Sequence, residues 1–111
     1  MPMDTSYDKP EPTRAEVDAL AGPTVLEFGA AWCEFCQGAQ PAIAAALADH
    51  PGVRHIKVGD GKGKPLGRSF GVKLWPTLVF LKDGKELARA VRPTEEDEVR
   101  RGLEAIAGTA V

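Results

Sequence analysis

The sequence lacks the features that would assign it to a membrane, a nucleic acid or a disulfide-stapled scaffold. Its 111 residues include only two cysteines, and no apolar run approaches the roughly 18 residues that a membrane-spanning helix needs. The formal net charge is −2, so no basic surface for nucleic acid or an anionic membrane is expected. Internal repeats and low-complexity segments are also missing. We therefore expect one ordinary globular domain with no nucleic-acid or membrane partner.

The N-terminal residues lack the basic and apolar regions of a secretory signal peptide. We therefore expect a cytoplasmic protein, in which thiols stay reduced and a lone cysteine pair is more often catalytic or metal-binding than structural. Three prolines and a single large aromatic residue, Tyr7, predict that residues 1–12 are a mobile tail. Residues 13–111 are long enough to bury a core and are expected to form the domain.

Helical and strand patterns alternate along the chain, which predicts an α/β fold. An Asp-Gly turn joins the last two strand-like runs as a hairpin. The order α-β-α-β-α-β-β-α predicts parallel strands joined by a helix, followed by an antiparallel hairpin. The strand-like runs are residues 24–30, 53–59, 76–81 and 85–91, and the helical segments are 13–22, 33–49, 66–71 and the residues from Thr94 onward.

The segment "GAAWCEFCQGAQP", residues 29–41, holds both cysteines. Cys33 stands where a strand ends and a helix begins. The unpaired N–H groups and the dipole of a helix N-terminus stabilise a thiolate and lower the pKa of a thiol there. Cys36 lies one helical turn further along the same face, within reach of Cys33. The spacing therefore favours an attacking thiol and a resolving thiol that exchange disulfides.

A bare Cys-x-x-Cys pair is also compatible with half of a metal site or with two inert buried thiols. A structural zinc site needs four ligands. The remaining candidates are His50, at the end of a helix, and His55, within a strand, and no second cysteine pair is present. We therefore predict no metal site, and a redox pair is favoured over both alternatives.

Two segments resemble the thioredoxin family: "VLEFGAAWCEFCQGAQP" and, about 40 residues later, "GVKLWPTLVFLKDGKEL". They contain Trp-Cys-x-x-Cys, a proline five residues after the second cysteine, and a Pro-Thr pair that opens a strand before a Lys-Asp-Gly turn. The resemblance spans residues 13–107. It implies a thioredoxin-like α/β fold with a central mixed sheet of four strands, or five if the N-terminal residues add one, flanked by helices.

The resemblance also assigns roles to the residues around the pair. Cys33 matches the family's nucleophile and Cys36 its resolving thiol. Pro76 matches the cis-proline that faces the disulfide and lines the substrate groove. Trp75 would offer backbone groups to an extended substrate segment, with core packing as the alternative. Trp32 would help to bind substrate and would cover the helix start, shielding the thiolate.

Glu27 interrupts an apolar strand, which by itself indicates a solvated strand face. The resemblance instead matches Glu27 to a buried acid six residues before the first cysteine. A carboxyl buried there would have a raised pKa and could take the proton of Cys36 through a water. Lys57 matches a lysine that often lies near this acid, with an exposed strand lysine as the alternative.

The chain departs from the family pattern at five positions. Glu34 and Phe35 stand where the family usually has Gly-Pro, so we expect both to modulate the site. Gly29 replaces a tryptophan, while Leu74 and Arg92 replace glycines. A bulkier and partly charged groove predicts fewer partners than a broad-range thioredoxin has.

The expected function is thiol–disulfide oxidoreduction in cell redox homeostasis, with net reduction of disulfides in partner proteins. We expect a monomer that needs no cofactor beyond an electron donor such as a reductase. Glu34 shares the first helical turn with Cys33 and would slightly raise the pKa of that thiol. One alternative is a redox-sensing adaptor that docks one partner without catalysis. The other is a metal-binding module that uses the pair alone or across a dimer.

Overall fold

The computed structural model describes residues 3–107, which form a four-stranded sheet with helices on both faces. The strand order is β2-β1-β3-β4, with β1 parallel to β2 and antiparallel to β3, and β3 antiparallel to β4. The elements follow the predicted order, and the fold is thioredoxin-like as the resemblance implied. They are α1 Arg14–Asp18, β1 Pro23–Gly29, α2 Glu34–Ala48, β2 Arg54–Gly59, α3 Pro65–Ser69, β3 Thr77–Lys82, β4 Lys85–Val91 and α4 Glu96–Ile106.

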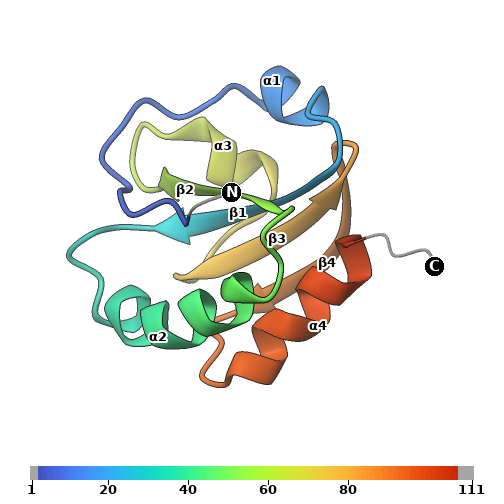
Figure 1. Ribbon diagram of the computed structural model, residues 1–111. Coiled ribbons are helices and arrows are strands. Elements are labelled where there is room, and N and C mark those ends of the chain that lie inside the picture. The colour runs from blue at the N-terminus through green and yellow to red at the C-terminus, as the bar shows by residue number, and fades with distance from the viewer. Residues whose placement is uncertain (1–2, 108–111) are drawn as a thin grey trace.

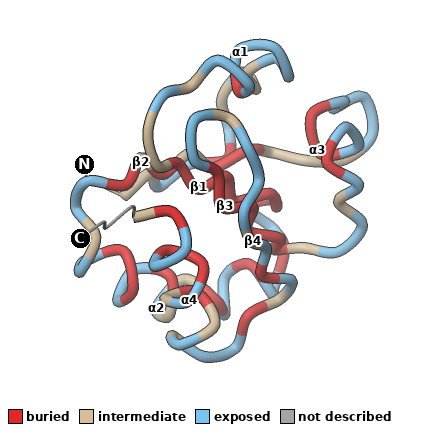
Figure 2. The backbone as a smooth tube through the Cα atoms, turned by 90° about the vertical axis from the view of Figure 1, so that its right-hand side faces the viewer, coloured by how far each residue is buried: buried red, intermediate tan, exposed pale blue. Residues whose placement is uncertain are grey.

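The sheet separates two apolar cores (Figure 1). Side chains alternate along a strand, so Val25 of β1 faces α2 and α4 while Leu26 and Phe28 face α1 and α3. The central strands β1 and β3 are buried on both sides, which explains their nearly continuous apolar sequence (Figure 2). Glu27 points to the same side as Val25, and it is therefore a fully buried carboxyl beneath α2.

The helix α2 positions the cysteines at one end of the sheet. It begins directly after Cys33, whose extended backbone makes it the N-cap residue. The helix continues through Pro41, and its buried face, which includes Cys36, Ala39 and Ile43, packs towards the sheet. None of the helices within residues 3–107 has the length and apolar character required to cross a membrane.

Residues 1–12 were predicted to be a mobile tail, but in the structure the segment from Asp4 to Lys9 packs along the outer edge of β2. The backbone N–H of Asp4 donates to Nδ1 of His55 at 2.9 Å, and the Asp4 carboxylate accepts from the backbone N–H of Lys57 at 3.0 Å. Lys9 Nζ donates to the Lys57 carbonyl at 2.9 Å. Tyr7, between them, is only 8% exposed.

These contacts explain why the described residues contain no fifth strand. Side chains of the N-terminal segment, rather than a further backbone ladder, bind the polar groups at the free edge of β2. A prediction based on proline content could not anticipate this arrangement, because it depends on partners about 50 residues away in the sequence.

Candidate active site

The two cysteines lie where β1 ends and α2 begins, and they are not joined by a disulfide. The Cys33 sulfur accepts a hydrogen bond from the backbone N–H of Cys36 at 3.1 Å. Cys33 is 6% exposed and Cys36 is 1% exposed. Helix geometry therefore brings the two thiols together as predicted, with Cys33 on the outer side and Cys36 beneath it.

Cys36 is held in its protonated form at neutral pH. Burial raises its pKa to about 12, and the hydrogen bond and charge of Cys33 contribute in the same direction. A hydrogen bond from the Ala30 backbone acts against this rise. Because only a thiolate attacks a disulfide, Cys36 needs a group that removes its proton.

Glu27 lies beneath the thiols and accepts three side-chain hydrogen bonds. His55 Nε2 is 2.8 Å from Glu27 Oε1, Gln40 Nε2 is 2.9 Å from Oε2, and the Tyr7 hydroxyl also donates to Oε2. His55 Nδ1 accepts from a backbone N–H and so carries no hydrogen, which places the ring proton on Nε2. The carboxylate is therefore surrounded by donors on both oxygens.

The predicted direction of the Glu27 pKa shift is wrong. Burial does raise the pKa of this carboxyl, but the hydrogen bonds from His55, Tyr7 and Gln40 lower it more, and the net pKa lies below its usual value. Burial alone was the basis of the sequence prediction. The donors that reverse the shift come from β2, α2 and the N-terminal segment.

Lys57 lies beside this carboxylate, as the resemblance implied. Its Nζ is 4.0 Å from Glu27 Oε2 and 4.6 Å from the centre of the Tyr7 ring. The residue is 6% exposed, so the alternative of an exposed strand lysine is wrong. The parallel register pairs Glu27 directly with Lys57, which explains their proximity.

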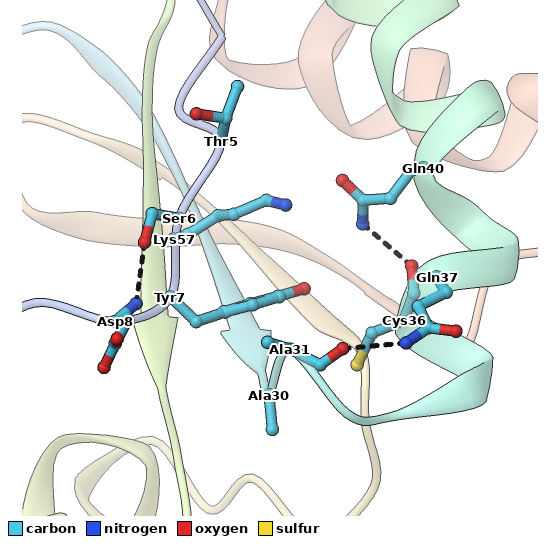
Figure 3. Close-up of a pocket in the computed structure, with 10 residues that line it drawn as sticks. All are labelled: Thr5, Ser6, Tyr7, Asp8, Ala30, Ala31, Cys36, Gln37, Gln40 and Lys57. Carbon is cyan, nitrogen blue, oxygen red and sulfur yellow. Dashed lines mark hydrogen bonds between the residues drawn. The ribbon is translucent and has the colours of Figure 1, made fainter.

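Tyr7 is the site residue that the sequence analysis missed. Its side chain reaches from the N-terminal segment towards α2, and its hydroxyl points to the region of Cys36 (Figure 3). Together they line a cavity of about 220 Å³, with Lys57 and Gln40 on its walls. The available sign was Gly29 in place of a tryptophan, because a small residue there leaves space for another side chain.

The Trp75–Pro76 peptide bond is cis, and Pro76 is buried at the start of β3. The Trp75 indole packs against the small buried cluster that contains both cysteines, and its Nε1 donates to Asp60 at 2.8 Å. Its carbonyl accepts from Arg92 Nε at 2.8 Å. One of the two backbone groups that Trp75 was expected to offer to a substrate is thus already bound within the protein.

The outer surface beside Cys33 is aromatic and exposed. Trp32 is 74% exposed and meets Trp75 edge-on, with ring centres 5.5 Å apart, so it does not cover the helix start as expected. Phe35 is 61% exposed, and the Arg92 guanidinium lies 4.1 Å from the centre of its ring. Glu34 is exposed in the first turn of α2.

Arg92 stands where the family has a glycine, and its backbone has the left-handed conformation, with φ 50°. Glycine adopts this conformation without strain, so the position retains the backbone geometry while adding a long charged side chain. Within residues 3–107, no group of three or more His, Cys, Asp or Glu side chains is placed to hold a metal ion.

Comparisons with known proteins agree with this geometry. The Thioredoxin family model matches residues 7–105. The structure of thioredoxin 2 from Pseudomonas aeruginosa PAO1 in its reduced form superposes with a TM-score of 0.85 at 53% identity, covering 96% of this chain and 98% of that one. A thioredoxin of Chlamydia muridarum is 37% identical over 83 residues, which are 74% of this chain and 81% of that protein.

A thioredoxin H-type 1 of Nicotiana tabacum is 36% identical over 73 residues, which are 66% of this chain but only 58% of the tobacco protein. The family match extends over most of the sequence, and the cysteine pair stands at the active-site position. The chain therefore belongs to the thioredoxin family and is a thiol–disulfide oxidoreductase.

Proposed function

We propose that this protein reduces disulfides of partner proteins, with Cys33 as the attacking thiol and Cys36 as the resolving thiol. This assignment is based on the different exposure and the different surroundings of the two cysteines. Cys33 is the more exposed cysteine and receives a backbone N–H on its sulfur, whereas Cys36 lies beneath it with a pKa raised to about 12. A partner disulfide can therefore reach the sulfur of Cys33, whereas the sulfur of Cys36 can react only after a mixed disulfide has formed on Cys33.

The reaction proceeds in two exchanges. The Cys33 thiolate attacks one sulfur of the partner disulfide, and the other partner sulfur leaves as a thiolate and takes up a proton. Cys36 then loses its proton and attacks the Cys33 sulfur, which releases the second partner thiol and forms the Cys33–Cys36 disulfide. The partner gains two electrons and two protons, and an external dithiol donor restores the pair.

The surface around Trp32, Phe35 and Trp75 is proposed to bind the partner segment, with cis-Pro76 beside the reacting sulfurs. Its aromatic exposure supports binding of an apolar segment. The Arg92 guanidinium lies over the Phe35 ring, and its Nε donates to the Trp75 carbonyl. Arg92 therefore reduces the area and the hydrogen-bonding groups that a partner can reach. We further propose a monomer that acts in the cytoplasm, where a reductase can supply electrons.

Trapping tests the proposal directly. A Cys36→Ser variant should retain partners as mixed disulfides that dithiothreitol releases, whereas a Cys33→Ser variant should retain none. The wild type should reduce insulin disulfides with excess dithiothreitol as donor. Trapping with Cys33→Ser instead of Cys36→Ser would reverse the two roles. Partner binding without any turnover would support the adaptor alternative.

A further inference from the structure

We propose that the Tyr7 hydroxyl carries the proton from the Cys36 thiol to the Glu27 carboxylate when Cys36 attacks the mixed disulfide. This inference rests on the proposed function. It adds a proton-transfer group next to Cys36, the more deeply buried of the two cysteines. It also replaces the water that the sequence analysis expected between the thiol and the acid.

The position of the hydroxyl supports this role. The Tyr7 hydroxyl donates to Glu27 Oε2, and the same hydroxyl lies beside the Cys36 sulfur, since both atoms border the empty side-chain position of Gly29. Tyr7 and Cys36 belong to one buried cluster, and both line the cavity drawn in Figure 3. One oxygen atom is therefore bonded to the group that can accept a proton and lies next to the group that must lose one.

Gly29 shows how closely the hydroxyl and the thiol are packed. A Cβ added at Gly29 would lie 2.6 Å from the Cys36 sulfur and 3.0 Å from the Tyr7 oxygen, both shorter than ordinary contacts. Any larger residue at this position would displace one of the two atoms. Gly29 stands where the family has a tryptophan. The absence of a side chain there leaves the space that the Tyr7 hydroxyl occupies.

The hydrogen-bond directions fit a relay. Because the hydroxyl hydrogen points to the Glu27 carboxylate, the free lone pairs of the Tyr7 oxygen can accept the hydrogen of the Cys36 thiol. As Cys36 attacks, its proton moves to the Tyr7 oxygen and the original hydroxyl proton moves to Glu27. Tyr7 ends as a neutral phenol that donates to the sulfur side, and Glu27 ends protonated.

The surrounding titratable groups favour a passive phenol over a phenolate. Burial and the charge of Glu27 raise the pKa of Tyr7 far above its usual value. The ionisable groups around the relay are Cys33 from the α2 N-terminus, His55 and Lys57 from β2, and Asp8 from the N-terminal segment. Tyr7 therefore passes a proton on without itself becoming charged.

The two exchanges can be followed in one stopped-flow experiment. The probe is 5,5′-dithiobis(2-nitrobenzoate), which releases one coloured thiolate when Cys33 forms the mixed disulfide and a second when Cys36 resolves it. Tyr7→Phe keeps the ring and removes only the hydroxyl. The first phase should keep its wild-type rate, and the second should slow by about tenfold or more at pH 7, as expected for loss of proton-transfer catalysis.

A dependence on pH separates a relay from a packing defect. The slowing in Tyr7→Phe should shrink as the pH rises towards 10, because hydroxide then removes the Cys36 proton directly. Glu27→Gln should slow the same phase, and the Tyr7→Phe/Glu27→Gln double variant should be no slower than the slower single variant. A slowing that is constant with pH, or additive effects in the double variant, would overturn the relay.

Gln40→Met is the matched control. Gln40 donates to the same Glu27 oxygen as Tyr7, so either substitution removes one donor and makes Glu27 more basic. Gln40 Nε2 also donates to the Cys36 backbone carbonyl at 2.8 Å, but this amide nitrogen has no lone pair that could accept the thiol proton, so Gln40→Met should leave the second phase unchanged or faster. Equal slowing in both variants would refute the relay alone. Absence of either phase in the wild type would refute the proposed function as well.

Discussion

The redox pair has an outer side and an inner side that differ in nearly every physical property. On the outer side, Trp32 and Phe35 are 74% and 61% exposed, and the contacts are aromatic and cation–π. On the inner side, Glu27 has no exposed surface and its neighbours are hydrogen-bond donors. The two cysteines share one helical turn but belong to different environments.

This difference separates two tasks of the protein. Exposed aromatic groups can adapt to a partner surface, and their loss changes binding more than folding. A buried carboxylate with three donors must keep its geometry, because an uncompensated charge in the interior is costly. Substitutions on the inner side should therefore affect both stability and proton transfer, whereas those on the outer side should affect partner choice.

The largest expected effect comes from removing the charge at the centre of the inner side. Glu27→Ala leaves its three donors without an acceptor and should lower the free energy of unfolding by about 3 kcal/mol or more. Urea unfolding measures the change. Glu34→Ala removes an exposed carboxylate nearby and should change the same quantity by less than about 0.5 kcal/mol. Similar losses in both variants would mean that the inner network is not stabilising.

Acid should weaken the inner side in a defined direction. The pKa of Glu27 is lower in the folded protein than in the unfolded chain, so the unfolded chain binds more protons as the pH falls below about 4.5. The stability contributed by this group is present above that pH and is lost as the pH falls through the folded pKa. The slope is at most about 1.4 kcal/mol per pH unit for one group.

Glu27→Gln should lack this contribution. Its free energy of unfolding, measured in urea at several pH values, should approach that of the wild type as the pH decreases. A difference between the two proteins that stays constant from pH 7 to pH 3 would show that Glu27 titrates equally in both states. Asp4, whose pKa is also lowered, remains in both proteins and cancels in the comparison.

On the outer side, the sharpest variant is Arg92→Gly. It frees the Trp75 carbonyl and the Phe35 face while suiting the left-handed backbone. We expect kcat/KM for insulin disulfides to rise by about threefold to tenfold, the size of one or two weak contacts. Lys73→Gly removes an exposed charge two residues before Trp75 and should have little effect. An equal gain in both variants would assign the effect to charge alone.

The smallest expected effect belongs to Glu34. Its negative charge lies in the first turn of α2, one residue after Cys33, and a unit charge at such an exposed position repels a second negative charge by roughly 0.8 kcal/mol or less. Glu34→Gln should therefore speed alkylation of Cys33 by iodoacetamide at pH 7 by up to about threefold. Peptide mass mapping should find the label on Cys33 before Cys36, and 1 M salt should remove the difference between the proteins. Slower labelling in the variant would contradict this role.

The arrangement of the thiols on the outer side could be predicted from the sequence, although the exposure of Trp32 could not. Cys33, Cys36 and their flanking aromatic residues are contiguous, and helical spacing alone places the two thiols on one face. The order of helices and strands along the chain, the parallel pair and the antiparallel hairpin also followed from local patterns and a turn. These features depend on interactions within a few residues, which a single sequence expresses directly.

The inner side could be predicted only in part. Glu27 was identified by its position, but the sign of its pKa shift depends on donors from three separate segments. Tyr7 could not be assigned, because its segment carries no helical or strand periodicity and its role exists only when it packs on β2. On the outer side, Trp32 was expected to cover the helix start, yet no local pattern determines how far a single indole projects.

The attachment of residues 4–9 to β2 also affects whether copies of the protein can associate through the edge of the sheet. Asp4 and Lys9 bind the backbone N–H and carbonyl of Lys57 at the free edge of the sheet. A chain shortened by its first nine residues would keep every helix and strand, but β2 would present an open edge to other molecules. The segment that places Tyr7 near the thiols thus also covers the edge of β2, which disfavours edge-to-edge aggregation.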